Sequence, residues 1–234
     1  MIHPHDLPIY QQKAKILEAL AANQVIVVES PTGSGKTTQL PIILYEAGYA
    51  SKGIIGITQP RRIATLSVSD FIARQLNTTI PGIVGYKMRF EDATGPNTAI
   101  KIMTDGILLQ EMKLDPYLAH YSVIMVDEAH ERSLNIDFIL GLLKKVLEAR
   151  SEFRVIVSSA TINAEVFSEY FGECPVVRID APMYPVRVVY DAIKAAPEAS
   201  LTPEPGAGKA EEGYYRSSDE ALYEKILSIV GRVV

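Results

Sequence analysis

A glycine-rich segment, ESPTGSGKTTQ, follows an apolar run and precedes a stretch that favours a helix. A helix that begins there points its free N–H groups and the positive end of its dipole toward an anion. Gly33 and Gly35 let the backbone curl around phosphate oxygen atoms, and Lys36 can then reach the β and γ phosphates of a nucleotide. We therefore expect this loop to bind ATP, through Thr32, Gly33, Ser34, Gly35, Lys36, Thr37 and Thr38.

The same loop departs from its usual pattern at one position. Ser30 stands where Gly or Ala is common, and a small residue still fits there. The Thr37 hydroxyl is the expected ligand of a Mg²⁺ ion that accompanies the nucleotide. An ordinary Gly/Ser turn before a helix is the alternative interpretation of the segment.

Two carboxylates end a second apolar run, VIMVDEAH. Placing carboxylates beside an apolar core costs free energy, and a bound cation would explain their presence. Asp127 is the expected Mg²⁺ ligand, and Glu128, in the same metal site, is the expected general base that polarises the attacking water. Lys36 and Glu128 are thus the predicted catalytic residues. His130 could be a metal ligand, although Mg²⁺ prefers oxygen; a coupling hydrogen bond or plain packing is the alternative.

Short β-branched runs alternate with longer segments of helical period. This pattern predicts an α/β fold, a mostly parallel sheet with helices on both faces. The predicted strands are residues 25–29, 54–58, 99–103, 122–127 and 154–158. Apolar side chains recur at helical spacing between Asn135 and Leu147, and a helix through Ile16, Leu17 and Leu20 is predicted before the first strand.

The composition limits the classes of protein and of site. The chain has 234 residues, of which 47% are hydrophobic and 22% charged, which suits one sizeable folded domain. Its single cysteine, Cys174, excludes an internal disulfide and a cysteine-built zinc site. A net charge of −5 argues against wholesale polyanion binding, so any nucleic-acid surface must be local. Without a secretory signal or an apolar span, we expect a cytoplasmic protein with no membrane partner.

Further motifs follow in a fixed order: TQPRR at 58–62, TDGIL at 104–108, DEAHERSLNIDF at 127–138 and SAT at 159–161. With GSGKTT, they make residues 5–190 similar to the DEAH-box helicases of superfamily 2, in wording most like the bacterial HrpA-type branch. The resemblance implies a RecA-like P-loop NTPase domain at 1–190. It also implies Mg-ATP hydrolysis coupled to movement along single-stranded nucleic acid, RNA rather than DNA, and to its unwinding.

The resemblance assigns roles to further residues. TQPRR and TDGIL line the family's strand groove, here through Arg61, Arg62 and Thr104, and GYKMRFED adds Arg89. Adjacent guanidinium groups at a strand end also suit phosphate contact, although a solvated arginine pair is the alternative. SAT links nucleotide state to strand binding, which implies coupling roles for Ser159 and Thr161 beside His130.

One position differs from the family. Relatives commonly carry an arginine nine residues after Arg62 that stacks on the adenine, and this chain has Phe71. A phenyl ring can stack on a purine as well, so Phe71 is a candidate nucleotide contact. The alternative is a core position in a helix.

The chain changes character after Tyr190. A segment rich in Pro, Gly, Ala and Glu is interpreted as a linker at 191–213, and an amphipathic pattern at 214–234 as the incomplete start of a second RecA-like domain. The family's arginine fingers belong to that partner domain, and no QRxGRxGR motif occurs in the sequence. We therefore expect a part of a longer protein, poorly active alone. A P-loop ATPase without helicase activity and a non-enzymatic adaptor are the competing interpretations.

Overall fold

The apolar runs form strands whose side chains alternate between two cores. The computed structural model describes residues 7–160, 164–180 and 226. In β1 (Val25–Glu29), Ile26 and Val28 pack into one core, whereas Val25 and Val27 pack into the other. A period of two with both sides apolar is typical of a strand in a parallel sheet that is covered on both faces.

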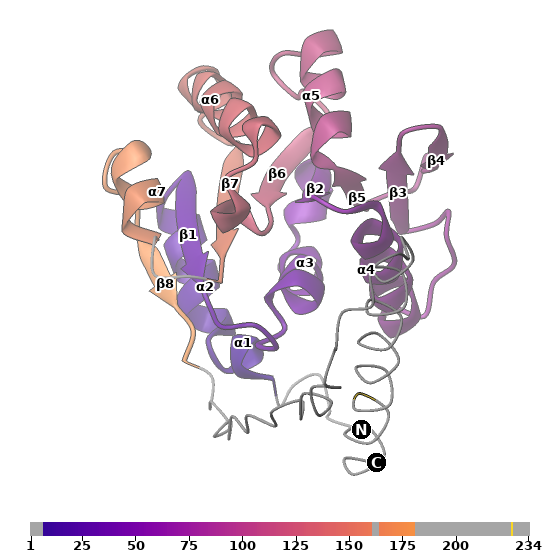
Figure 1. The fold of residues 1–234 in the computed structure, drawn as a ribbon, viewed down its shortest axis with the longest axis horizontal. Helices are drawn as coiled ribbons and strands as arrows, with labels where there is room; N and C mark the ends of the chain where they lie inside the picture. Colours follow the sequence, from indigo (N-terminus) through magenta and orange to yellow (C-terminus); the bar gives the residue numbers. More distant parts are fainter. Residues whose placement is uncertain (1–6, 161–163, 181–225, 227–234) are drawn as a thin grey trace, which may run out of the picture. The chain divides into compact units, whose positions relative to one another are not determined.

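The strands assemble into one sheet. It has eight strands in the order β4-β3-β5-β2-β6-β7-β1-β8, as Figure 1 shows from β4 on one side to β8 on the other. The pairing of β3 with β4 is antiparallel and the other pairings are parallel. The further strands are β2 (Ile54–Gln59), β3 (Val84–Met88), β4 (Glu91–Ala93), β5 (Ile100–Thr104), β6 (Tyr121–Val126), β7 (Arg154–Ser159) and β8 (Val176–Arg178).

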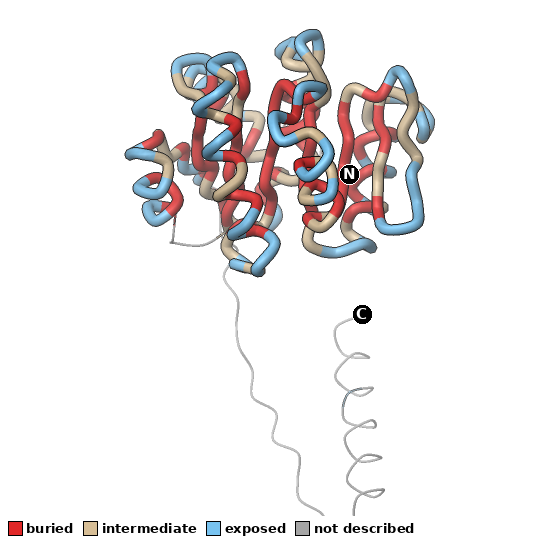
Figure 2. The backbone as a smooth tube through the Cα atoms, turned by 90° about the horizontal axis from the view of Figure 1, so that it is seen from above, coloured by how far each residue is buried: buried red, intermediate tan, exposed pale blue. Residues whose placement is uncertain are grey.

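Helices cover both faces of the sheet. One core contains residues of α2, α3 and α4, and the other contains residues of α5, α6 and α7. Figure 2 shows the buried positions concentrated along the strands and the inward sides of these helices. The helices are α1 (Pro8–Gln11), α2 (Lys13–Ala22), α3 (Lys36–Glu46), α4 (Arg62–Gln75), α5 (Asp105–Leu114), α6 (Leu134–Ala149) and α7 (Ala164–Tyr170), with 3₁₀ turns η2 (Tyr49–Lys52) and η3 (Ala129–Glu131).

The predicted α/β class, the mostly parallel sheet and the helices on both faces are confirmed. Strand β1 has the predicted bounds, whereas β2, β5, β6 and β7 differ from their predicted ranges by one residue at one or both ends. Strands β3, β4 and β8 were not predicted, because they are short or interrupted by polar residues. The predicted helix at 135–147 lies within α6, whose N-cap Ser133 accepts a hydrogen bond from the Ile136 amide.

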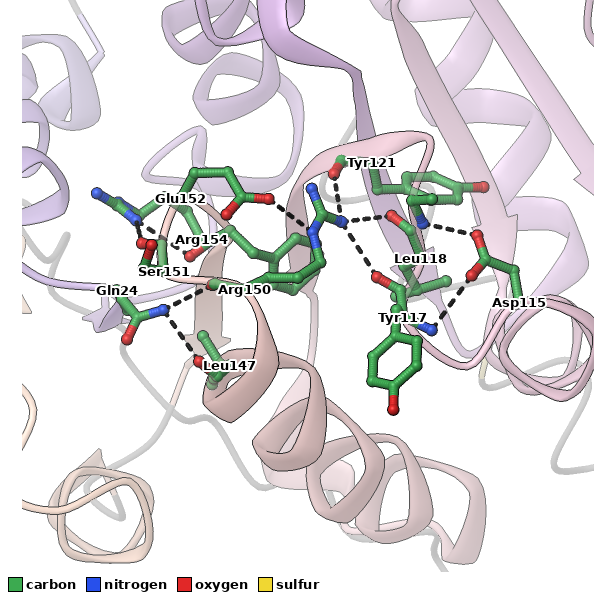
Figure 3. Close-up of polar contacts among 12 residues, drawn as sticks. Gln24, Asp115, Tyr117, Leu118, Tyr121, Leu147, Arg150, Ser151, Glu152 and Arg154 are labelled. Carbon is green, nitrogen blue, oxygen red and sulfur yellow. Dashed lines mark hydrogen bonds and ion pairs between the residues drawn. The ribbon is translucent and has the colours of Figure 1, made fainter.

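Arg150 holds the segment that leads into β6, at the amino ends of the strands. The Nη1 atom of Arg150, before β7, donates to the carbonyl oxygens of Tyr117, Leu118 and Tyr121, at 3.1, 2.6 and 3.1 Å (Figure 3). Gln24, before β1, donates in turn to the Arg150 carbonyl at 2.9 Å. A planar guanidinium satisfies several carbonyl groups at once, so this edge is structurally fixed. The loops at the carboxyl edge carry the predicted chemistry.

The chain divides into two units, Met1–Pro182 and Met183–Val234. The predicted linker at 191–213 lies outside the described residues. So does the predicted domain start at 214–234, apart from Ile226. Within the described part of the chain, no helix has the length and apolar character needed to cross a membrane.

Candidate functional site

The loop between β1 and α3 has the backbone of an anion cradle. Gly33 and Gly35 have φ angles of 82° and 92°, in the left-handed region that favours glycine. A Cβ atom at Gly35 would lie 3.0 Å from the Leu7 Cδ1 atom. Both the left-handed φ and this short distance therefore disfavour a larger residue at position 35. Helix α3 begins at Lys36, and its first free N–H groups are therefore presented by this loop.

The unusual serine of the loop has a structural partner. The buried hydroxyls of Ser30 and Ser34 lie 2.8 Å apart and close the loop at its base. The Ser30 amide also donates to the carbonyl oxygen of Ser159 at 3.1 Å. The loop is thus joined to the end of β7, where the SAT segment begins.

Asp127 lies one residue beyond β6 and is fully buried. Its Oδ2 atom accepts hydrogen bonds from Thr37 Oγ1 at 2.7 Å and from Gln59 Nε2 at 2.5 Å. Its Oδ1 atom accepts one from Ser158 Oγ at 2.7 Å. Three donors from three other segments therefore fix the carboxylate and offset the cost of burying it.

The oxygen atoms around Asp127 fit a magnesium ion. Mg²⁺ takes oxygen ligands, commonly one or two from the protein with the rest from phosphate and water, and Thr37 and Asp127 present two adjacent oxygens. Over residues 7–160, 164–180 and 226, no three His, Cys, Asp or Glu side chains gather into a metal-binding group. Two such oxygens would suit an ion that a bound nucleotide also ligates.

Glu128 lies between a lysine and a histidine. Its Oε1 atom is 3.3 Å from Lys36 Nζ, and its Oε2 atom is 3.4 Å from His130 Nε2. The Glu128 side chain is 26% exposed, so water can reach it, whereas Lys36 is 5% exposed. Glu128 itself has a left-handed φ of 52°, a strained conformation of the kind that clusters at functional sites.

His130 joins the carboxylate to the SAT segment. Its Nδ1 atom accepts a hydrogen bond from the Ala160 amide at 3.3 Å. Because an accepting nitrogen carries no proton, the neutral ring places its proton on Nε2, toward Glu128. The hydrogen bond between His130 and the SAT segment is thus present, and its coupling role stays a prediction. Ser159 is buried at the end of β7, and Thr161 lies outside the described residues.

The predicted strand-binding residues lie along the same edge of the sheet. Arg61 and Arg62, at the start of α4, line a surface hollow of about 830 Å³ with Met88 and Glu91 of the β3–β4 hairpin. Arg89 lies in that hairpin, with its guanidinium 4.9 Å from the Phe90 ring centre. Thr104 ends β5, is half-buried and does not line the hollow.

The core interpretation of Phe71 is wrong. The side chain is on α4, and it is 49% exposed. It is therefore free to contact a ligand, and its stacking on a base stays a prediction.

Four functional candidates were not singled out from the sequence. Gln59 and Ser158 hold Asp127, and Glu131 forms an ion pair with Arg61 at 3.0 Å. The fourth, Asp105, is 4% exposed, and burial raises its pKa to about 6, with the nearby carboxylates Glu131 and Asp127 adding to the rise. Gln59, Ser158 and Asp105 lie at or next to the carboxyl end of a strand, and Glu131 directly follows the DEAH motif. Position at a carboxyl strand end or beside a motif is the signal that could have found them.

Comparison with known proteins gives a consistent result. A model of the DEAD/DEAH box helicase family matches residues 10–169. The chain is 57% identical over 185 residues to the ATP-dependent RNA helicase HrpA of Borreliella burgdorferi, covering 79% of this chain and 22% of that protein. It is 50% identical over 191 residues to the ATP-dependent RNA helicase HrpA of Escherichia coli, covering 82% of this chain and 15% of that protein. It thus spans less than a quarter of the length of these curated relatives.

Proposed function

Since the chain belongs to the DEAD/DEAH box helicase family, we propose that it is the ATP-binding motor domain of an RNA helicase. The observation that carries the proposal is the convergence on Asp127 of Thr37 from the glycine-rich loop and Ser158 beside the SAT segment. In the full-length protein this domain would couple ATP hydrolysis to movement along a single strand and to unwinding.

The nucleotide phosphates would lie against the start of α3. Backbone N–H groups of Thr32–Thr38 would surround them, and the Lys36 ammonium, now beside Glu128, would turn to the β and γ phosphates. Departure of Lys36 frees Glu128 Oε1 to accept a proton from the attacking water. Phe71, exposed on α4, is proposed to stack on the base without reading its edge.

Thr37 and Asp127 are the proposed ligands of Mg²⁺, with Glu128 beside them. When bound, the ion would neutralise charge that develops on the transferred phosphoryl group. Gln59 and Ser158 donate hydrogen bonds to the two oxygen atoms of the Asp127 carboxylate and would hold it in position for the ion. His130 connects the base to the SAT segment, which supports coupling roles for His130, Ser159 and Thr161.

Arg61, Arg62, Arg89 and Thr104 are proposed to contact the backbone of the strand. The exposed arginines around the hollow at α4 support this, because guanidinium groups bind phosphate well at an accessible site. Such contacts favour no base sequence. RNA as the physiological strand is supported by the names of the two relatives.

A second RecA-like domain is the proposed partner in the same full-length chain. Arginine fingers supply about 10³–10⁵ in rate in phosphoryl transfer, so we propose that these 234 residues alone are a slow ATPase. Residues 191–213 as linker and 214–234 as the start of the partner remain part of this proposal. A cytoplasmic location is also proposed, in keeping with the lone Cys174.

ATP turnover of the full-length protein tests the proposal when measured with no nucleic acid, with oligo(U) and with oligo(dT). A helicase motor predicts turnover that rises with added strand and rises more with RNA. A P-loop ATPase without helicase activity predicts turnover that ignores both strands. The Arg61→Ala/Arg62→Ala variant should raise the oligo(U) concentration needed for half-maximal stimulation.

A further inference from the structure

The turn η3 contacts both proposed sites through neighbouring residues. His130, on the nucleotide side, is 3.4 Å from Glu128 and accepts the Ala160 amide. Glu131, the next residue, pairs with Arg61 on the strand side, with Oε1 3.0 Å from Nη2. A change in the Arg61–Glu131 contact can therefore reach the His130–Glu128 contact through two adjacent residues of η3.

The ion pair with Glu131 occupies the Arg61 guanidinium that a strand phosphate would bind. The Arg61 side chain is 76% exposed and Glu131 is 32% exposed, so an incoming phosphate can reach the guanidinium. A phosphate that binds Arg61 in a bidentate manner must replace Glu131, or place its negative charge beside that carboxylate. Since like charges repel, phosphate binding and the Glu131 pair oppose each other.

We propose that Glu131 is a positioning residue that competes with a strand phosphate for Arg61, and that its release transmits strand binding through η3 to His130 and Glu128. This inference rests on the proposed function. It assigns to Glu131 a role that neither the motif DEAH nor the groove arginines account for.

The backbone on either side of η3 is strained. The residues on either side of the turn, Glu128 and Arg132, have left-handed φ angles of 52° and 48°. Such strained residues persist only while their surroundings hold them, and they cluster at switches. Glu131 is one of these restraints through Arg61, and Arg132 is held separately by Asp137 at 2.8 Å.

The charges near η3 support the same direction of effect. Glu131 and Asp127 both raise the pKa of the buried Asp105, after the larger effect of its burial, so negative charge at Glu131 acts unfavourably on the Asp105 carboxylate. Arg61 offsets part of this negative charge. When Arg61 turns to a phosphate, the unpaired Glu131 is left among like charges, which favours its movement away from the site.

A double-mutant cycle on strand affinity tests the competition. The 234-residue chain is titrated onto labelled oligo(U), followed by anisotropy, as wild type, Glu131→Gln, Arg61→Ala and the double variant. An exposed ion pair is worth up to about 1 kcal/mol, so Glu131→Gln should tighten binding by up to about five-fold. In the Arg61→Ala background the same substitution should change nothing. Asp137→Asn is the control, because it removes an equal charge from a neighbouring ion pair that does not involve Arg61.

The link to the nucleotide is read from Mg-ATP affinity with and without saturating oligo(U). Because binding linkage is reciprocal, the Mg-ATP affinity of the wild type should change when oligo(U) is bound. Glu131→Gln should still bind the strand, and its change in Mg-ATP affinity should be smaller. Equal tightening by Glu131→Gln in both backgrounds, or by Asp137→Asn, would overturn the inference. If Arg61→Ala weakens strand binding and Glu131→Gln alters neither readout, Glu131 has no such role and the groove stands. Strand binding that ignores Arg61 and Arg62 contradicts the proposed groove itself.

Discussion

The Thr37 hydroxyl donates a 2.7 Å hydrogen bond to the Oδ2 atom of Asp127, a residue 90 positions later in the chain. The contact joins the start of α3 to the end of β6. It brings together two oxygen atoms that we propose as ligands of a nucleotide-bound Mg²⁺.

Substitution of Thr37 should change how nucleotide binding depends on the metal. Thr37→Ala removes one of the two proposed ligand oxygens, so addition of Mg²⁺ should strengthen ATP binding less than in the wild type. Thr37→Ser keeps the hydroxyl and should retain the full effect. The measurement is the ATP affinity of wild type and both variants in Mg²⁺ and in EDTA. If Mg²⁺ strengthens ATP binding by Thr37→Ala as much as by the wild type, Thr37 is not a metal ligand.

Glu128→Gln should preserve nucleotide binding and stop hydrolysis. The amide keeps the shape of the side chain and loses its basicity, and a general base contributes about 10²–10⁴-fold. Single-turnover ATP hydrolysis by the full-length protein measures the loss, with the exposed Glu169→Gln as a control of equal charge change. Turnover within a few-fold of the wild type would mean that another group orients the water.

Asp105 should make stability depend on pH. Its pKa is about 6 in the folded chain and 3.8 ordinarily, so the folded state holds the proton more tightly than the unfolded state. Wild-type stability therefore falls as the pH rises from about 4 through about 6, and the loss is complete above that range.

Asp105→Asn cannot ionise, so its melting temperature relative to the wild type should be higher at about pH 7.5 than at about pH 4.5. The exposed Asp70→Asn serves as control, and should show no such trend. A constant difference between Asp105→Asn and wild type at both pH values would show that Asp105 is not a buried ionisable group of raised pKa.

Features that depend on a short segment of the chain could be predicted from the sequence alone. The glycine-rich loop, the DEAH carboxylates and the strand β1 follow from short segments whose residue types have few other uses. Family membership and the α/β sheet were predicted on the same basis and are confirmed.

The partners of Asp127 depend on strand register, which residue types do not reveal. Val126 pairs with Thr58 on one side and Val157 on the other, so the next residues, Gln59 and Ser158, come level with Asp127. The Arg61–Glu131 pair likewise joins segments 70 residues apart. Strands β4 and β8 have three residues each and lie at the sheet edges, so neither presents a long apolar run. In β3, the sequence VGYKM interrupts the apolar run with glycine and lysine.

Thermal unfolding of the chain with and without Mg-ATP tests the central claim most directly. Ligand that binds only the folded state adds about 2.7 kcal/mol at 100 times its Kd, so the wild type should melt at a higher temperature with Mg-ATP. Lys36→Ala should lose this shift. Lys13→Ala, which replaces a half-buried lysine that is also held in an ion pair, should keep it. A shift that persists undiminished in Lys36→Ala would contradict the assignment of the nucleotide site to this loop.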